Sequence, residues 1–248
     1  MKKPKIKRLF FDIETSPNIG LFWSPGINIT LNHENIVEER RIICVCYKWA
    51  GEKKVHHLDW GKNQCDKELL EKFIAVMDDA DEVVAHNGNR FDIKWLRTRC
   101  LKHDIPMMPN YASIDTCSLA KRRFKFNSNA LDYIGRFLDV GQKNETTYGL
   151  WKNVLLENDK KSLKTMIDYC KQDVKLLEQV WDKMNSYVAA TTNYATHTHH
   201  CPECGSSNVH IKKYRVTASG YRKVQTQCQD CGKYATMAAN RFHKRKAI

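Results

Sequence analysis

The stretch Phe10-Phe11-Asp12-Ile13-Glu14-Thr15 joins an apolar run to two closely spaced acids. A run of this kind predicts a buried strand, which we place over residues 8–13. Because side chains alternate across a strand, Asp12 and Glu14 point to the same face. Two adjacent like charges repel each other, so one pKa should rise unless a cation lies between them. The pair is therefore a candidate divalent-metal site, although acids at the end of a strand can also simply face solvent.

Outward from this stretch, strand and helix patterns alternate along the chain. Strands are predicted at 41–49, 54–58, 82–85 and 113–116, and helices at 66–77, 91–100, 130–138 and 161–187. Asn129 is available as the cap of the third helix. The three successive strands at the start suggest a meander, and the later alternation predicts an α/β domain around a mixed sheet with helices on both faces. Small, polar and His residues break the pattern at 191–200, so we expect a domain over 1–190, a linker over 191–200 and a separate module over 201–248.

Two further motifs carry acids. In Asn87-Gly-Asn-Arg-Phe-Asp92, a polar turn leads to an acid that opens a helix. Taken alone, Asp92 is more simply explained as a first-turn acid that interacts with the helix dipole. Tyr169 and Asp173 are four residues apart and so share one face of the last helix, a spacing that any amphipathic helix can also show.

In this order the three motifs resemble those of the DEDDy exonucleases, a family with a ribonuclease H-like fold that includes polymerase proofreading domains and ribonuclease D-like enzymes. The resemblance covers residues 5–187, and the segments 114–116 and 128–133 are similar to the connection found in stand-alone, virus- or bacterium-type members. It implies that two Mg²⁺ or Mn²⁺ ions are held by four carboxylates, namely Asp12, Glu14, Asp92 and Asp173. Oxygen ligands suit such hard cations, and a pair of them can stabilise both the attacking and the leaving oxygen of a phosphodiester.

The resemblance also implies roles for residues beside the carboxylates. Tyr169 would orient the attacking water, and Thr15 and Asn87 would contact the terminal nucleotide. His86 is expected to be structural, because Tyr169 occupies the place where a DEDDh enzyme has its general-base His. The expected activity is a 3′-to-5′ exonuclease that releases nucleoside 5′-monophosphates, with single-stranded DNA favoured by the resemblance alone. Replication or repair proteins are the expected protein partners.

Three other activities stay open at this point. A 3′-to-5′ exoribonuclease of the same fold would use the same site, since a two-metal site does not itself read a 2′-hydroxyl. A nucleic-acid-binding module that has lost catalysis is disfavoured by the complete set of carboxylates. An endonuclease of the same broad fold is disfavoured because those families arrange their acids differently and lack the Tyr-x3-Asp motif.

Four cysteines in the tail form two pairs, Cys201-x2-Cys204 and Cys228-x2-Cys231, each followed directly by Gly. Four thiolates satisfy a structural Zn²⁺ with no open position, and metal binding would supply folding free energy to a segment too small for a core of its own. The segment resembles a zinc ribbon. Disulfides are the alternative, and His197, His199 and His200 are potential substitute ligands that we expect to be linker residues. The other six cysteines are scattered, which suits a reducing compartment.

The tail is also the basic part of the chain. Of the formal net charge of +13, residues 190–248 contribute +8, from ten Lys and Arg against two acids. Such a surplus favours a polyanion, because cations that neutralise phosphates release condensed counterions. Basic residues interleaved with aromatics predict nucleic-acid contacts at Lys212, Lys213, Arg215, Arg222 and Lys223, with a further basic run at 241–246. Docking of a protein is the rival role for the ribbon.

No apolar run reaches the roughly 18 residues of a membrane helix, and the first residues do not fit a signal peptide. We therefore expect a cytoplasmic protein with no membrane partner.

Overall fold

The computed structural model describes residues 6–24, 26, 32–144 and 146–243. The chain forms two compact units, Arg8–Gln179 and Val180–Ile248 together with the start of the chain. This division falls inside the last long helix, α6 (Lys160–Asn185), and not in the predicted linker at 191–200. The predicted boundaries at 190 and 200 therefore stay predictions.

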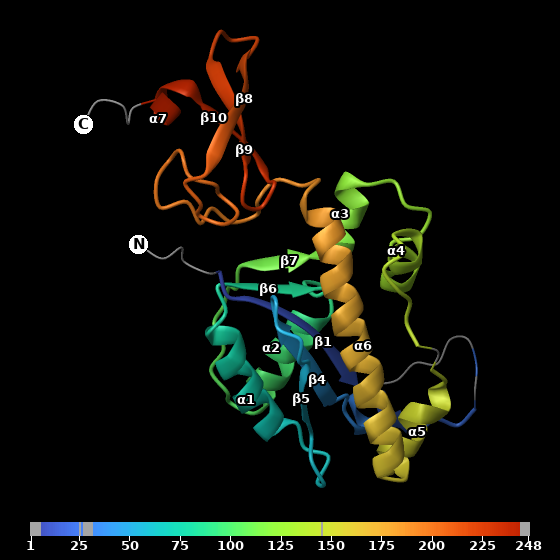
Figure 1. Cartoon of the computed structure of the whole chain (residues 1–248). Helices are drawn as coiled ribbons and strands as arrows, with labels where there is room; N and C mark the ends of the chain where they lie inside the picture. The colour runs from blue at the N-terminus through green and yellow to red at the C-terminus, as the bar shows by residue number, and fades with distance from the viewer. Residues whose placement is uncertain (1–5, 25, 27–31, 145, 244–248) are drawn as a thin grey trace. The chain divides into compact units, whose positions relative to one another are not determined.

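The larger unit is built on a five-stranded mixed sheet with the order β5-β4-β1-β6-β7 (Figure 1). Its strands are β1 (Arg8–Thr15), β4 (Ile42–Trp49), β5 (His56–Asp59), β6 (Glu82–Ala85) and β7 (Ser113–Asp115). The first three are antiparallel, which confirms the predicted meander, and β6 and β7 continue the sheet in parallel with β1. Two short strands, β2 (Ile19–Gly20) and β3 (Ile36–Glu38), and a 3-10 turn, η1 (His33–Asn35), were not predicted.

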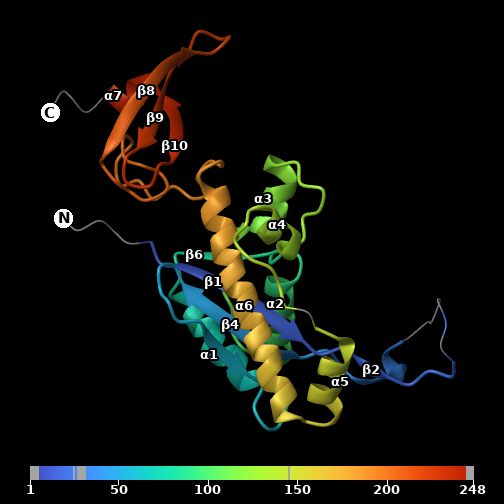
Figure 2. The ribbon, with the colours of Figure 1, turned by 45° about the vertical axis from the view of Figure 1, so that its right-hand side comes forward.

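Helices cover both faces of this sheet (Figures 1 and 2). Alternation along β1 sends Leu9, Phe11 and Ile13 into a core that also contains residues of α1 (Lys67–Asp78) and α2 (Asp92–Lys102). The alternate residues, including Asp12 and Glu14, lie on the other face, where α6 runs across the sheet. The predicted α/β class, with a mixed sheet between helices, is confirmed.

The connection between β7 and α6 contains three shorter helices, α3 (Thr116–Arg123), α4 (Leu131–Phe137) and α5 (Tyr148–Leu156). Neither α3 nor α5 was predicted, and α3 begins at once after β7 because the Asp115 carboxylate caps it by accepting from the Ser118 amide at 3.0 Å. The predicted cap of α4 is wrong. Ala130 holds that position, and the side-chain oxygen of Asn129 is buried without a hydrogen bond among the described residues, while its backbone carbonyl accepts from His86 Nε2 at 2.9 Å.

A buried carboxylate fastens the sheet to α1 and α2. Asp66 is fully buried and accepts hydrogen bonds from the Ile42 amide at 3.0 Å, from Arg99 at 2.7 and 2.9 Å and from His103 at 2.8 Å. Burial opposes ionisation of Asp66, but the bonds from Arg99 and from the Ile42 amide hold its pKa below the usual value. The network joins β4 to the two helices and so supports the face of the sheet opposite the acids.

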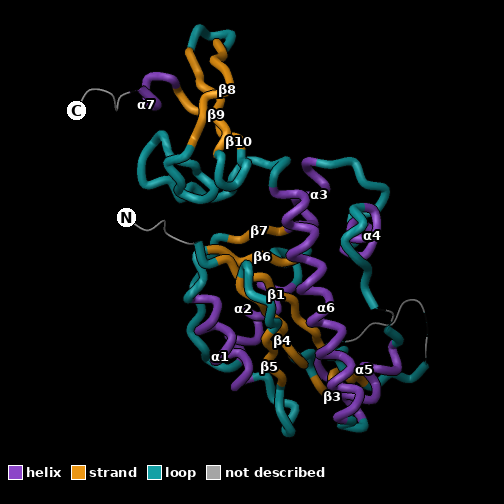
Figure 3. Tube along the Cα trace, viewed as in Figure 1, coloured by secondary structure: helices purple, strands orange, loops and turns teal. Residues whose placement is uncertain are grey.

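The second unit contains a three-stranded antiparallel sheet with the order β10-β9-β8 (Figure 3). Its strands are β8 (Val209–Val216), β9 (Arg222–Cys228) and β10 (Tyr234–Ala238), followed by the short helix α7 (Ala239–His243). Among the helices in the described part of the chain, none is both long and apolar enough to cross a membrane.

Candidate active site and metal centres

Four carboxylates that are far apart in the sequence approach one another on the α6 side of β1. The strand itself supplies Asp12 and Glu14. Asp92 is the first residue of α2 and is 2% exposed, and its Oδ1 accepts from the amide of Ile13, the residue between the two strand acids in the sequence, at 3.2 Å. Asp173 comes from α6 and is 1% exposed. The three predicted acidic motifs therefore meet at one place.

The electrostatics of this group are those of crowded, buried acids. Burial, followed by electrostatic repulsion from the neighbouring ionisable groups, raises the pKa of Asp12 well above its ordinary value. Burial likewise raises the pKa of Glu14 and of Asp173, and raises that of Asp92 to about 7. Ionising all four at neutral pH therefore costs free energy unless cations compensate for it, which is the property expected of a divalent-metal site.

Lys143 is a member of this site that the sequence did not indicate. Its Nζ lies 2.6 Å from Asp173 Oδ2 and donates to the Tyr169 hydroxyl at 3.2 Å, and its backbone amide donates to Asp132 at 2.8 Å. Burial opposes protonation of Lys143, but the charges of Asp173 and Asp12 outweigh it and raise the pKa of the ammonium group. Lys143 is therefore a fixed cation beside the acids and beside Tyr169.

Tyr169 and Cys170 occupy the turn of α6 that faces β1. Burial, together with the charge of Asp173, raises the pKa of Tyr169 to about 12, so its hydroxyl keeps its proton at neutral pH. The Cys170 thiol lies 3.6 Å from Asp12 Oδ2, and the two groups with Glu14 have ligand atoms within 4.8 Å of one another. Carboxylate oxygens are ligands that suit Mg²⁺ or Mn²⁺, so Asp12 and Glu14 could together hold such an ion.

The turn before α2 is held from β7. Asn87 has a left-handed backbone with φ of 65°, and the Asp115 carboxylate accepts from the Asn87 amide at 3.1 Å and from the Asn89 amide at 3.3 Å. His86, just before this turn, has both ring nitrogens engaged, with Thr116 Oγ1 at 2.9 Å and the Asn129 carbonyl at 2.9 Å. These contacts agree with the structural role expected for His86, and they make Asp115 a supporting residue of the site.

Thr15, next to Glu14 along β1, opens onto a pocket of about 330 Å³. The pocket is lined by small polar residues, one cation and two aromatic rings, namely Thr15, Ser16, Pro17, Arg40, Thr146, Thr147, Tyr148 and Trp151. Tyr148 and Trp151 come from α5, the helix that was not predicted. A base and its phosphate are the kind of ligand that this combination can hold.

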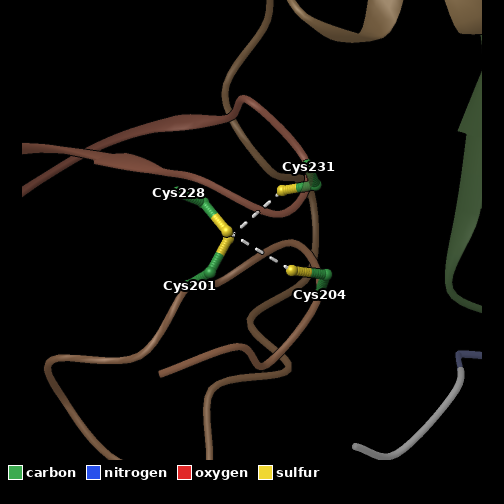
Figure 4. A group of neighbouring side chains, drawn as sticks. All are labelled: Cys201, Cys204, Cys228 and Cys231. Atoms are coloured by element: carbon green, nitrogen blue, oxygen red, sulfur yellow. Dashed lines mark hydrogen bonds between the residues drawn. The ribbon is translucent and has the colours of Figure 1, made fainter. Parts of the chain in front are cut away.

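The four tail cysteines form a second centre (Figure 4). The Cys201 and Cys231 sulfurs are 3.6 Å apart, those of Cys204 and Cys228 are 3.7 Å apart, and all four lie within 4.8 Å of one another. A tetrahedral Zn²⁺ with Zn–S bonds of about 2.3 Å has sulfurs about 3.8 Å apart, so the two shorter separations are those of a zinc site and the four sulfurs could hold one ion. No disulfide joins them.

Both cysteine loops have the same local structure. The Gly205 amide donates to the Cys201 carbonyl at 2.9 Å, and the Gly232 amide donates to the Cys228 carbonyl at 3.0 Å. Both glycines have positive φ, 66° and 75°, which supports the tight turn expected after each second ligand. The predicted basic contacts lie exposed on β8 and β9, whereas residues 244–246 of the basic run lie outside the described residues.

The comparisons with known proteins bear on the larger unit. A family model of the RNase H superfamily matches residues 9–185. No match was found among curated protein sequences. Among solved structures, the chain is similar to the family B DNA polymerase from the hyperthermophilic archaeon Pyrobaculum calidifontis, with a TM-score of 0.57 and 18% identity over 74% of this chain and 25% of that one. This chain thus spans about a quarter of the polymerase, and the likeness shows a shared fold. Because the family model matches well over half of the sequence, the chain belongs to the RNase H superfamily.

Proposed function

We propose that the chain is a metal-dependent 3′-to-5′ exonuclease of the DEDDy type that removes nucleoside 5′-monophosphates from single-stranded DNA. The observation that carries this proposal is the meeting of Asp12, Glu14, Asp92 and Asp173 at one face of β1, with Tyr169 one helical turn before Asp173. The fold shared with a family B DNA polymerase supports it, because the sequence motifs resemble those of polymerase proofreading domains.

The four carboxylates would hold two Mg²⁺ or Mn²⁺ ions. When bound, such ions polarise the scissile phosphodiester and activate water. Tyr169 keeps its proton, so its hydroxyl can hold and orient the attacking water by hydrogen bonding. The cation Lys143 contacts both the Tyr169 hydroxyl and the Asp173 carboxylate and so holds the two groups in place relative to each other. Both residues are positioning groups whose removal should slow hydrolysis more than it weakens substrate binding.

The terminal nucleotide would occupy the pocket at Thr15. Its aromatic rings, Tyr148 and Trp151, can stack on a base, and Arg40 supplies a cation for a phosphate. Asn87, on the turn before Asp92, is the second proposed contact to this nucleotide. In the other unit, one structural Zn²⁺ would be held by Cys201, Cys204, Cys228 and Cys231, and the ribbon would bind the nucleic acid beyond the terminus.

A panel of end-labelled substrates tests the activity and its polarity. Single-stranded and double-stranded DNA, single-stranded RNA and a single-stranded DNA circle are incubated with the full chain and Mg²⁺ or Mn²⁺. We expect stepwise shortening of the linear single-stranded DNA from its 3′ end and release of mononucleotides. Cutting of the circle would replace the proposal with an endonuclease, and faster digestion of RNA would replace it with an exoribonuclease.

Variants tie the activity to the site. Asp12→Ala should abolish hydrolysis, and retained activity would reject the four-carboxylate centre. Tyr169→Phe removes only a hydroxyl and should lower kcat while KM changes little. Tyr111→Phe is the matched control, because it removes a phenol hydroxyl that donates to Asp78 away from the carboxylates. Equal rates for the two Tyr variants would remove Tyr169 from the mechanism.

A further inference from the structure

The five basic residues predicted to contact nucleic acid do not all lie on the same face of the ribbon sheet, as the register of its strands shows. Directly opposed residues of antiparallel strands project from the same face. Tyr214 of β8 and Met237 of β10 are both opposite Val224 of β9, whereas Arg215 and Ala238 are both opposite Lys223. Lys213 is opposite Gln225 and shares the face of Lys223. Arg222 is two residues from Val224 on β9 and so lies on the other face. Lys212 lies in a β-bulge between Ile211 and Lys213.

One of the two faces is covered within the ribbon. Val224 and Thr226 are buried there, and Tyr214 stacks on His243 of α7, with its hydroxyl 3.1 Å from His243 Nε2. The helix therefore packs against this side. Arg222 and Arg241 line a pocket beside α7. This face therefore carries the small core of the ribbon, with Arg222 and Arg241 at its edge.

The opposite face, which we call the open face, is lined by His210, Lys213, Arg215, Lys223, Gln225, Gln227, Tyr234, Thr236 and Ala238. None of these residues is buried. The set contains three permanent cations, two amides and an aromatic ring that is 47% exposed, and it contains no acid. A sheet face of this composition is polar, positively charged and accessible.

Arg215 and Lys223 are directly opposite each other across β8 and β9. Like charges in a cross-strand pair repel each other, so an anion bound beside them would stabilise the sheet. Among the described residues no acid pairs with Lys213, Arg215 or Lys223. The two acids of the ribbon are engaged elsewhere, since Glu203 pairs with Lys233 at 3.4 Å and Asp230 accepts from Asn208 at 2.9 Å. The three cations are therefore available to an anion from outside the ribbon.

We infer that the open face of the ribbon sheet binds single-stranded nucleic acid, with Lys213, Arg215 and Lys223 on the phosphates and Tyr234 stacked on a base. Charge complementarity selects a polyanion, and the aromatic ring beside the cations selects one with exposed bases. The inference rests on the proposed function and deepens it, because it assigns the substrate-holding surface to one face and excludes Arg222 on the other.

Two charge-matched double variants test the assignment in an Asp12→Asn background, in which substrate is not consumed. Arg215→Gln with Lys223→Gln removes the opposed pair, and Arg222→Gln with Arg241→Gln removes two cations of the α7 side. Affinity for a labelled single-stranded oligonucleotide is measured by anisotropy over a range of salt concentrations. Since each phosphate contact contributes about 0.7 to the slope of log affinity against log salt, the first variant should flatten the slope by about 1.4 and the second should leave it unchanged.

Tyr234→Ala should weaken binding by roughly 5-fold to 150-fold, the range of base–aromatic stacking, without changing the slope. Zinc content and thermal unfolding are compared for every variant. As a measurement on the protein without ribbon substitutions, amine acylation read by mass spectrometry should show Lys213 and Lys223 protected by the oligonucleotide and Lys212 less so.

Equal losses of oligonucleotide affinity in the two double variants would overturn the inference, because they would show that the basic residues of both faces contribute alike. Unchanged oligonucleotide affinity in the Arg215 and Lys223 variant would overturn it in favour of protein docking at this face. Binding is read without catalysis, so an oligonucleotide that binds but is never shortened by the unsubstituted chain would reject the proposed exonuclease and leave the open face supported.

Discussion

Replacing Asp92 by Asn should make the metal-free protein more stable while it removes the proposed nuclease activity. Asp92 is 2% exposed, and its Oδ1 accepts from the Ile13 amide at 3.2 Å, a bond that the Asn oxygen can keep. The substitution therefore removes a charge with little change of shape. The charge is unfavourable in the folded protein, because burial raises the pKa of Asp92 from 3.8 to about 7.

The sign and size of the effect follow from proton linkage. Between pH 3.8 and about 7 the folded state holds a proton that the unfolded state has lost, so the stability contributed by Asp92 is complete below pH 3.8 and is lost as pH rises through about 7. At 1.36 kcal/mol for each pKa unit, the loss at pH 8 reaches up to about 4 kcal/mol. We expect the free energy of unfolding of Asp92→Asn to exceed that of the unsubstituted protein by roughly 2–4 kcal/mol at pH 8, and by less at pH 5.

Urea unfolding without divalent ions, at pH 5 and pH 8, measures this difference. Mg²⁺ should stabilise the unsubstituted protein at pH 8 and should have little effect on the variant, because an ion that binds only the folded site adds stability by mass action. Asp159→Ala is the control of opposite sign, since Asp159 accepts from the Ser162 amide at 2.9 Å at the start of α6 and its loss should lower the free energy of unfolding. An Asp92→Asn protein that is no more stable than the original at pH 8 would refute the reasoning.

Three further outcomes are expected. Lys143→Met should lower the hydrolysis rate by about tenfold to a hundredfold, with partial recovery in Lys143→Arg, because it removes the cation that lies 2.6 Å from Asp173 and donates to the Tyr169 hydroxyl; an unchanged rate would contradict this. Asp66→Ala should lower the free energy of unfolding by about 3–5 kcal/mol, since it leaves buried Arg99 without its carboxylate partner. Glu68→Ala, which breaks an exposed pair on the same helix, should change the free energy of unfolding far less in the same urea titration. Cys201→Ser should reduce bound zinc well below one ion per chain in elemental analysis and unfold the ribbon, and a full complement of zinc would argue against the four-sulfur centre.

The part of the site that the sequence could predict depends on short-range geometry. Strand alternation places Asp12 and Glu14 on one face, and helical periodicity places Tyr169 and Asp173 on one face, whatever the rest of the chain does. Asp92 needed more. Its contact with the Ile13 amide joins residues 79 positions apart, and only the order of the motifs, compared with a known family, indicated that they meet.

Other features depend on tertiary contacts that no local pattern carries. Lys143 lies in a connection without periodicity, and its place in the site depends on its ion pair with Asp173, thirty positions later. Asn129 was predicted to cap a helix, but that helix begins one residue later and its cap position falls on Ala130. The basic residues of the ribbon could be counted in the sequence, yet a bulge at Lys212 decides which of them share a face, and a bulge leaves no clear mark in the sequence.

The place of β1 in the sheet also has a consequence for motion. The strand is central, paired with β4 on one side and β6 on the other, so its amides should be among the slowest in the protein to exchange with deuterium. Lys143 is carried instead by a connection outside the sheet and the helices. Two of the acids are thus held by the backbone pairing of β1 with β4, whereas the cation beside Asp173 is held by its contacts with Asp132, Tyr169 and Asp173, so removal of one of these partners should shift Lys143 and leave the strand acids in place.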